Sequence, residues 1–229
     1  MKTYNFDELI DRTNTNCIKY DGRMAFFGNP DVLPLWVADM DFRTPDFIVQ
    51  AIKERADKDI YGYTFRAESY NQSIVNWLKR RHNWEIKPEW ISFSPGVVAG
   101  LTLAIEALSK LGDGVIIQPP VYFPFFDSVK GLGRELIENP LRLENGRYYF
   151  DLEDLRNKIT PRTRLLLLSN PHNPGGMAWS EKELSELAQI CLENNVLIIS
   201  DEIHSDLIFE GFHHTPLAGI SDEIAQNCV

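Results

Sequence analysis

The sequence VLIISDEIHSDL, residues 196–207, joins a run of apolar residues directly to two carboxylates and an imidazole. The run VLIIS has no polar alternation, which is typical of a strand buried on both faces of a parallel sheet. Asp201, Glu202 and His204 follow it at once. One interpretation is that the strand has reached the surface and that these side chains are solvated. The other is that the strand end binds a ligand that requires a buried negative charge.

Three other apolar runs end in a similar way and read as strands, and they are WISFSPG (90–96), VIIQPPVY (115–122) and LLLLSNPHNP (165–174). Helical patterns separate these runs, which predicts an α/β fold with a mainly parallel sheet and helices on both faces. In such sheets ligands bind at the carboxyl ends of the strands. Turn preferences explain each ending alone, but the four endings together favour one shared site.

Local signals place helices and turns between the strands. Apolar residues at helical spacing predict a helix over 97–114. The pair Asn145 and Gly146 predicts the turn of a β-hairpin. Ser180, with Glu183 three residues later, predicts a capping box at the start of a helix.

The composition is that of a folded, acidic protein, with 44% hydrophobic residues, 24% charged residues and a formal net charge of -10. This charge argues against nucleic-acid binding, which needs lysines and arginines to displace counterions. The three cysteines form no C-x-x-C pair, which suggests a reducing compartment. No apolar run approaches the ~18 residues of a membrane span, and the first residues lack a secretory apolar segment. We therefore expect a cytoplasmic protein with no membrane span.

Three of the strand ends suggest how a ligand would be held. The sequence SPGVVAG (94–100) reads as a helix start, where free N–H groups and the helix dipole favour an anion such as phosphate. Ordinary capping is the alternative, since the P-loop pattern is absent. The stretch PPVYFPFF (119–126) offers four aromatic residues, Tyr122, Phe123, Phe125 and Phe126, and one of them could stack on a planar ring, whereas a core cluster is the better explanation for three of the four. In SNPHNPGG (169–176), the prolines fix a loop in which Asn173 could point its amide at a ligand oxygen.

The carboxylate at the end of the last strand requires a partner. A carboxylate in an apolar pocket is costly without a cation, and a protonated ring nitrogen of a ligand would serve. The alternative is a metal site made from Asp201, Glu202, His204, His213 and His214. We rank it lower because the H-E-x-x-H spacing is absent, and because a metal explains neither the phosphate-type turn nor the aromatic loop.

These motifs, in this order, resemble those of the fold-type I pyridoxal phosphate enzymes, the class I/II aminotransferase superfamily. SNPHNPGG is similar to the superfamily's loop with two Asn-Pro pairs, and SDEIHSDL is similar to its Asp-Glu-x-(Tyr/His) strand end. More narrowly, PLWVADMDF, YGYTF, SPGVVAGL and PPVYFPF resemble the cystathionine β-lyase-like branch, the cysteine-S-conjugate β-lyases. The resemblance extends from about residue 30 to the end of the chain.

The resemblance implies that the cofactor is pyridoxal 5′-phosphate, and it gives roles to particular residues. Asp201 would pair with the pyridinium nitrogen, and Asn173 would bond the phenolic oxygen close to the substrate carboxylate. Tyr122 would stack on the ring, and His204 stands where transaminases carry a tyrosine. The backbone that would hold the phosphate belongs to Gly96, Val97 and Val98.

The resemblance also implies a homodimer and a substrate border. Tyr63 would reach the phosphate of the neighbouring subunit's cofactor, with Tyr61 as the alternative. Backbone around Trp36 and Val37 would border a small amino-acid substrate. No metal ion, nucleic acid or membrane is implied.

These enzymes need a Schiff-base lysine on the loop after the next strand, and no lysine follows Asp201 in this chain. Cys228 and Val229 read as the start of that strand. We therefore expect the N-terminal part of a longer enzyme, with no catalytic residue here and the lysine beyond Val229. Residues 46–229 would form the large cofactor-binding domain, incomplete at its C-terminus, and residues 1–45 would contribute to a small domain.

The function implied is that of a carbon–sulfur β-lyase that acts on cystathionine or cysteine S-conjugates and gives thiol, pyruvate and ammonia. One alternative is an aminotransferase of the same superfamily. The other is a binding or regulatory module that does not catalyse, which the missing lysine would support.

Overall fold

The computed structural model describes residues 4–229 and divides into two compact units, the first ending at Phe65 and the second beginning at Arg66. The sequence predicted a boundary after residue 45. Helix α3 (Asp46–Ala56) groups instead with the N-terminal unit, and it buries none of its side chains. The assignment of residues 1–45 to a small domain stays a prediction.

The first unit is held together mainly by charged groups. Besides α3 it contains the short helices α1 (Ile18–Asp21) and α2 (Arg23–Phe27). The Arg12 guanidinium forms ion pairs with Asp39 and Asp41, and Lys19 Nζ lies 2.8 Å from Asp41 Oδ2. Because both cations contact the segment that follows Trp36, they fix that segment against α1.

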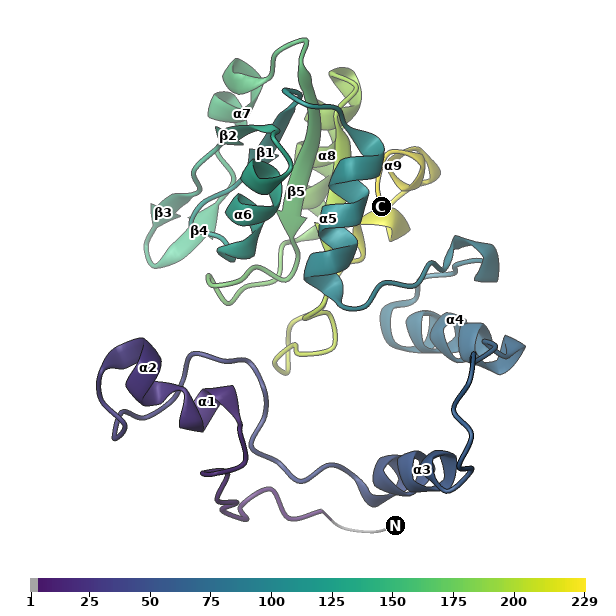
Figure 1. The fold of residues 1–229 in the computed structure, drawn as a ribbon. Coiled ribbons are helices and arrows are strands. Elements are labelled where there is room, and N and C mark those ends of the chain that lie inside the picture. The colour runs from purple at the N-terminus through teal and green to yellow at the C-terminus, as the bar shows by residue number, and fades with distance from the viewer. Residues whose placement is uncertain (1–3) are drawn as a thin grey trace. The chain divides into compact units, whose positions relative to one another are not determined.

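The second unit is built on a four-stranded parallel sheet in the order β2-β1-β5-β6 (Figure 1). The strands are β1 (Gly114–Ile117), β2 (Glu135–Glu138), β5 (Thr163–Ser169) and β6 (Leu197–Asp201). Cys228 forms a parallel bridge with Ile198 of β6, and Val229 N–H donates to the Ile198 carbonyl at 2.9 Å. This pairing is the one expected if Cys228 and Val229 start a further strand.

Helices cover both faces of this sheet, as the sequence predicted. Leu165 and Leu167 of β5 pack with α5 (Val97–Leu108) and α6 (Pro124–Gly131). Leu166 and Leu168 point to the other face, because side chains alternate along a strand. There they pack with α7 (Leu152–Lys158) and α8 (Glu181–Glu193). The remaining helices are α4 (Glu68–His82), α9 (Asp222–Gln226) and the 3₁₀ turns Pro88–Trp90 and Leu217–Gly219. No helix within residues 4–229 is long and apolar enough to cross a membrane.

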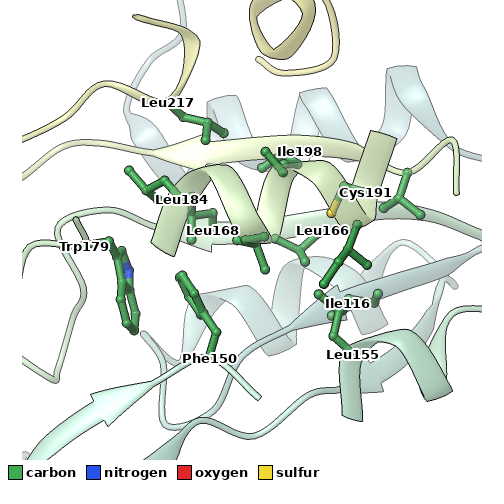
Figure 2. Packing of buried hydrophobic residues seen from close by; sticks show 14 of the residues in the cluster. Ile116, Phe150, Leu155, Leu166, Leu168, Trp179, Leu184, Cys191, Ile198 and Leu217 are labelled. Atoms are coloured by element: carbon green, nitrogen blue, oxygen red, sulfur yellow. The ribbon is translucent and has the colours of Figure 1, made fainter. Parts of the chain in front are cut away.

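A stacked aromatic pair forms part of the core on the α7–α8 face (Figure 2). The rings of Phe150 and Trp179 stack with centroids 3.8 Å apart and both side chains buried. The indole Nε1 of Trp179 donates to the carbonyl of Ser169 at 3.0 Å, so its one polar group is satisfied. Since Ser169 is the last residue of β5, this bond ties the core to the end of that strand.

Two local predictions have opposite outcomes. The hairpin is confirmed: β3 (Arg142–Glu144) and β4 (Arg147–Tyr149) flank Asn145 and Gly146, whose φ angles of 51° and 79° suit a tight hairpin turn.

The strand predicted over 90–96 is wrong. That segment starts in the 3₁₀ turn and continues without strand pairing, and Phe93 is exposed. The apolar run is too short to specify a strand without a neighbouring strand to pair with.

The capping box of α8 is confirmed and gives a measurable contribution to stability. Ser180 Oγ accepts the N–H of Glu183, and Glu183 Oε2 accepts the N–H of Ser180 at 2.9 Å. We expect Ser180→Ala to lower the free energy of unfolding by about 1 kcal/mol in urea titrations of the protein. Ser185→Ala, in the interior of the same helix, is the matched control and should change stability by less than ~0.5 kcal/mol. Equal effects of the two substitutions would contradict the capping role.

Candidate functional site

The ends of β1, β5 and β6 meet through backbone hydrogen bonds. Ser169 and Asp201 are paired in register, and the N–H of Asn170 donates to the Asp201 carbonyl at 2.9 Å. The N–H of Tyr122, beyond β1, donates to the Asn173 carbonyl at 3.0 Å. The structure therefore brings together Tyr122, Asn173 and Asp201, which the sequence had predicted to share a site.

The N-terminus of α5 lies at the same end of the sheet. Figure 1 shows α5 beginning at the end to which the arrow of β5 points. Gly96 precedes the helix with φ 119°, a conformation that L side chains rarely adopt, and no side chain caps this end. The first N–H groups of a helix have no partner within it, so the backbone from Val97 onward presents donors and the positive end of the helix dipole.

The Asp201 carboxylate is half-buried and lacks a cationic partner. Its Oδ1 accepts the N–H of Ile203 at 3.2 Å, and no ion pair reaches it within residues 4–229. Burial raises the pKa of Asp201, and the Ile203 N–H and the neighbouring His204 act in the opposite direction. A buried carboxylate of this kind is a binding position for a cation.

Asn173 and His204 border a pocket of about 780 Å³. The pocket lies between the loop after β5 and the loop after β6, and its lining is largely apolar; the apolar lining includes Met177, Trp179, Leu207, Phe209 and Phe212. Asp201 and Tyr122 are not part of this lining. The pocket therefore adjoins the cluster at the strand ends and offers room for a ligand beside it.

Sequence reasoning missed the part that His172 plays in shaping this site. Its side chain is only 4% exposed, and its Nδ1 accepts the N–H of Gly175 at 3.1 Å. A Cβ on Gly175 would lie 2.5 Å from that nitrogen, so only glycine allows the approach. The ring also packs edge-on against Trp179, with centroids 5.7 Å apart. The signal that the sequence offered was a histidine flanked by two Asn-Pro pairs.

Of the four aromatic residues that follow β1, Tyr122, Phe125 and Phe126 belong to or pack against the core, as the sequence predicted for three of the four. Phe125 is buried and Phe126 packs against the α5–α6 core, but Phe123 is 69% exposed. Tyr122 is half-buried, and its ring centroid lies 5.3 Å from that of Phe123. Tyr122 is thus partly accessible beside Asn173, as a ring-stacking residue must be.

The other predicted residues belong to the N-terminal unit. The indole Nε1 of Trp36 donates to the carbonyl of Lys19 at 3.1 Å, and its ring packs against Phe26 and Phe27. Val37 is half-buried, and Tyr63 is fully exposed. Their participation in the site stays a prediction.

Two residues of the metal alternative, Glu202 and His214, are paired with protein groups. Glu202 Oε2 lies 2.9 Å from His214 Nε2, and Glu202 Oε1 accepts the N–H of Leu217 at 3.0 Å. In the part of the chain that the structure describes, no group of three or more His, Cys, Asp and Glu side chains is arranged to hold a metal ion.

The environment of His172 predicts a pH dependence of stability. Burial lowers the pKa of His172 to about 4, against about 6.5 for an unfolded histidine. Between these values the unfolded chain binds a proton that the folded chain does not, so stability falls as the pH falls through this window. In His172→Asn the amide oxygen can still accept from Gly175, and no such proton is bound.

We therefore expect the unsubstituted protein to lose up to about 3 kcal/mol more stability than His172→Asn between pH 7 and pH 4. Urea unfolding at both pH values measures the difference, and the other titrating groups cancel between the two proteins. An equal loss in both would show that His172 is protonated in the folded state.

Comparisons with known proteins agree with this fold. The aminotransferase class I and II family matches residues 30–228. The chain is 46% identical to cystathionine beta-lyase PatB of Bacillus subtilis over 222 residues, which are 96% of this chain and 57% of that protein. Relatives of this kind are thus matched over little more than half of their length.

Two solved structures are also similar. A PLP-bound putative aminotransferase from Clostridium difficile 630 superposes with a TM-score of 0.95 and 51% identity, over 99% of this chain and 58% of that one. A PLP-bound C-S lyase from Staphylococcus hominis superposes with a TM-score of 0.90 and 38% identity, over 97% and 57% of the two chains. The family match covers most of the residues and the folds agree, so the chain belongs to the aminotransferase class I and II family.

Proposed function

We propose that the full-length protein is a pyridoxal-phosphate-dependent carbon–sulfur β-lyase that acts on cystathionine or cysteine S-conjugates. The observation that carries this proposal is the half-buried carboxylate of Asp201, which has no ion pair among residues 4–229, at the edge where three strand ends meet. The lyase activity is supported by the relatives, which include a cystathionine beta-lyase and a C-S lyase. Its products would be a thiol, pyruvate and ammonia.

The residues present fit pyridoxal 5′-phosphate. A half-buried carboxylate without a cation suits a protonated ring nitrogen. The uncapped start of α5, with open space where a Cβ of Gly96 would lie, suits a phosphate that approaches the backbone of Val97 and Val98. Tyr122 and Asn173, joined by a backbone bond, lie at the same strand ends.

When bound, the cofactor supplies an electron sink that stabilises negative charge on the substrate's α-carbon. Asp201 holds the proton on the ring nitrogen, which strengthens that sink. Asn173 donates its side-chain amide to the phenolic oxygen, Tyr122 keeps the ring in place by stacking, and the first turn of α5 holds the phosphate.

Several further assignments belong to this proposal. The enzyme would be a cytoplasmic homodimer in which Tyr63 reaches the cofactor phosphate of the neighbouring subunit. Trp36 and Val37 would border the amino-acid substrate, and His204 would stand near the cofactor's phenolic oxygen. The N-terminal segment would contribute to a small domain.

An aminotransferase is the second candidate, because one similar structure bears the name of a putative aminotransferase. The full-length protein with L-cystathionine separates the two. A lyase releases thiol together with pyruvate and ammonia. A transaminase converts the amino acid to its keto acid and releases no thiol, which would refute the lyase proposal. If neither thiol nor keto acid forms, a non-catalytic module would be favoured.

The Asp201 carboxylate provides a direct test of the cofactor site. We expect Asp201→Asn in the full-length protein to weaken cofactor binding by about 30-fold or more, because a buried charge pair that loses one partner costs ~2 kcal/mol or more. Absorbance titration with pyridoxal phosphate measures the change. Glu210→Gln, at an exposed position on the same loop, is the control and should bind the cofactor normally.

Without cofactor the same substitution should not destabilise the protein. Burial raises the pKa of folded Asp201 above its unfolded value, so stability is lost as the pH rises from the unfolded pKa to the folded one. The substituted side-chain amide carries no charge, so Asp201→Asn removes that loss, and thermal unfolding at pH 7 should show an equal or higher Tm. A lower Tm of the cofactor-free variant would indicate a structural role for the carboxylate instead.

A further inference from the structure

Glu202, the residue after Asp201, is the centre of a buried hydrogen-bond cluster. Its Oε1 accepts from Ser200 Oγ at 2.8 Å and from the N–H of Leu217 at 3.0 Å. Its Oε2 lies 2.9 Å from Nε2 of His214, whose side chain is 1% exposed. Because a carboxylate only accepts, His214 donates through Nε2. Glu202 thus links the end of β6 to the segment that contains His214 and Leu217.

The contacts of Glu202 form a first anchor for the segment between Glu202 and His214. A second anchor holds the middle of that segment. Asp206 Oδ1 lies 2.9 Å from Nε2 of His82, the last residue of α4, and Asp206 Oδ2 accepts from Trp77 Nε1 at 2.9 Å. The two anchors touch each other, because the rings of His82 and His214 pack edge-on with centroids 5.3 Å apart.

The segment between Glu202 and His214 is residues 203–213, which we call the anchored loop. It carries His204 and forms one side of the pocket. Most of its apolar side chains contribute little to holding it in place, since Leu207, Phe209 and Phe212 are 59%, 85% and 68% exposed and only Ile208 is half-buried. Its position within this unit therefore depends on the polar contacts of Glu202 and Asp206.

We propose that Glu202, His214 and Asp206 are positioning residues for the cofactor site. By fixing both ends and the middle of the anchored loop, they hold His204 beside the cofactor and keep the backbone around Asp201 in register with β5. This inference rests on the proposed function only in that a cofactor occupies the site; it is independent of whether the enzyme is a lyase or a transaminase.

The geometry around His214 offers a matched pair of variants. Its Nδ1 is buried and has no partner among the described residues, so Nε2 makes its only hydrogen bond. In His214→Gln the amide nitrogen can occupy the place of Nε2 and donate to Glu202. In His214→Leu the apolar bulk remains, but the donor is lost. The comparison therefore isolates the hydrogen bond from the packing of the ring.

The test uses the full-length protein with three measurements. Absorbance titration gives the affinity for pyridoxal phosphate, visible circular dichroism reports the setting of the bound cofactor, and hydrogen exchange of residues 203–213 is followed without cofactor. We expect His214→Leu to weaken the affinity about tenfold, the size of one lost hydrogen bond to a charged group, to alter the dichroism and to accelerate exchange. His214→Gln should restore all three toward the unsubstituted protein.

Asp206→Ala tests the second anchor if His214→Leu fails to fold, and it should give the same three changes. Its control is Arg81→Gln. Arg81 contacts the same carboxylate at 3.7 Å, but both groups are exposed, and exposed pairs contribute little. Arg81→Gln should therefore leave affinity, dichroism and exchange unchanged.

Normal affinity, dichroism and exchange in both His214→Leu and Asp206→Ala would overturn the inference. So would a His214→Gln variant as impaired as His214→Leu, since the ring rather than the donor would then matter. Cofactor binding without thiol release by the unsubstituted protein would refute the lyase proposal and leave this inference intact. No cofactor binding at all would refute both.

Discussion

The parallel pairing of β5 with β6 is the constraint on which the rest of the site depends. It places the N–H of Asn170 on the carbonyl of Asp201, so the loop after β5 and the carboxylate after β6 start from one fixed point. Both strands are apolar on both faces, and a shift of one residue would exchange the two cores that α5–α6 and α7–α8 cover. Register is therefore specified by burial on both sides, and the position of Asp201 follows from it.

The two neighbouring carboxylates at this strand end have opposite environments. Glu202 is satisfied by Ser200, His214 and the Leu217 backbone, whereas Asp201 receives one long bond from Ile203. Their side chains leave opposite faces of an extended backbone, so one can be committed to structure while its neighbour is left to bind. This division explains why two carboxylates in sequence need not form a metal site.

The sequence predicted those features that depend on local pattern. Apolar runs located β1, β5 and β6, and Asn145-Gly146 and Ser180 located a turn and a cap. Features that depend on contacts distant in the chain were not accessible. The run 90–96 has strand-like composition but no pairing partner, and the bond between Asp206 and Trp77 joins residues 129 apart. The same reason hid the enclosure of His172, because only the folded loop shows that its Nδ1 accepts from Gly175.

The hydrogen bonds made by the residues around Asp201 allow its carboxylate to remain without a cationic partner. A buried carboxylate without a partner favours any rearrangement that exposes it to water, and loops are the elements that rearrange most easily. Here the loop after β5 is fixed by prolines and by His172, and the loop after β6 is fixed by Glu202 and Asp206. Neither loop can move to hydrate Asp201 without breaking these hydrogen bonds, and a donor or acceptor that is left buried without a partner costs more than the bond contributes when made. The carboxylate of Asp201 therefore stays available to pair with a cationic ligand. The free energy that holds it in place comes from hydrogen bonds of residues that do not contact the ligand.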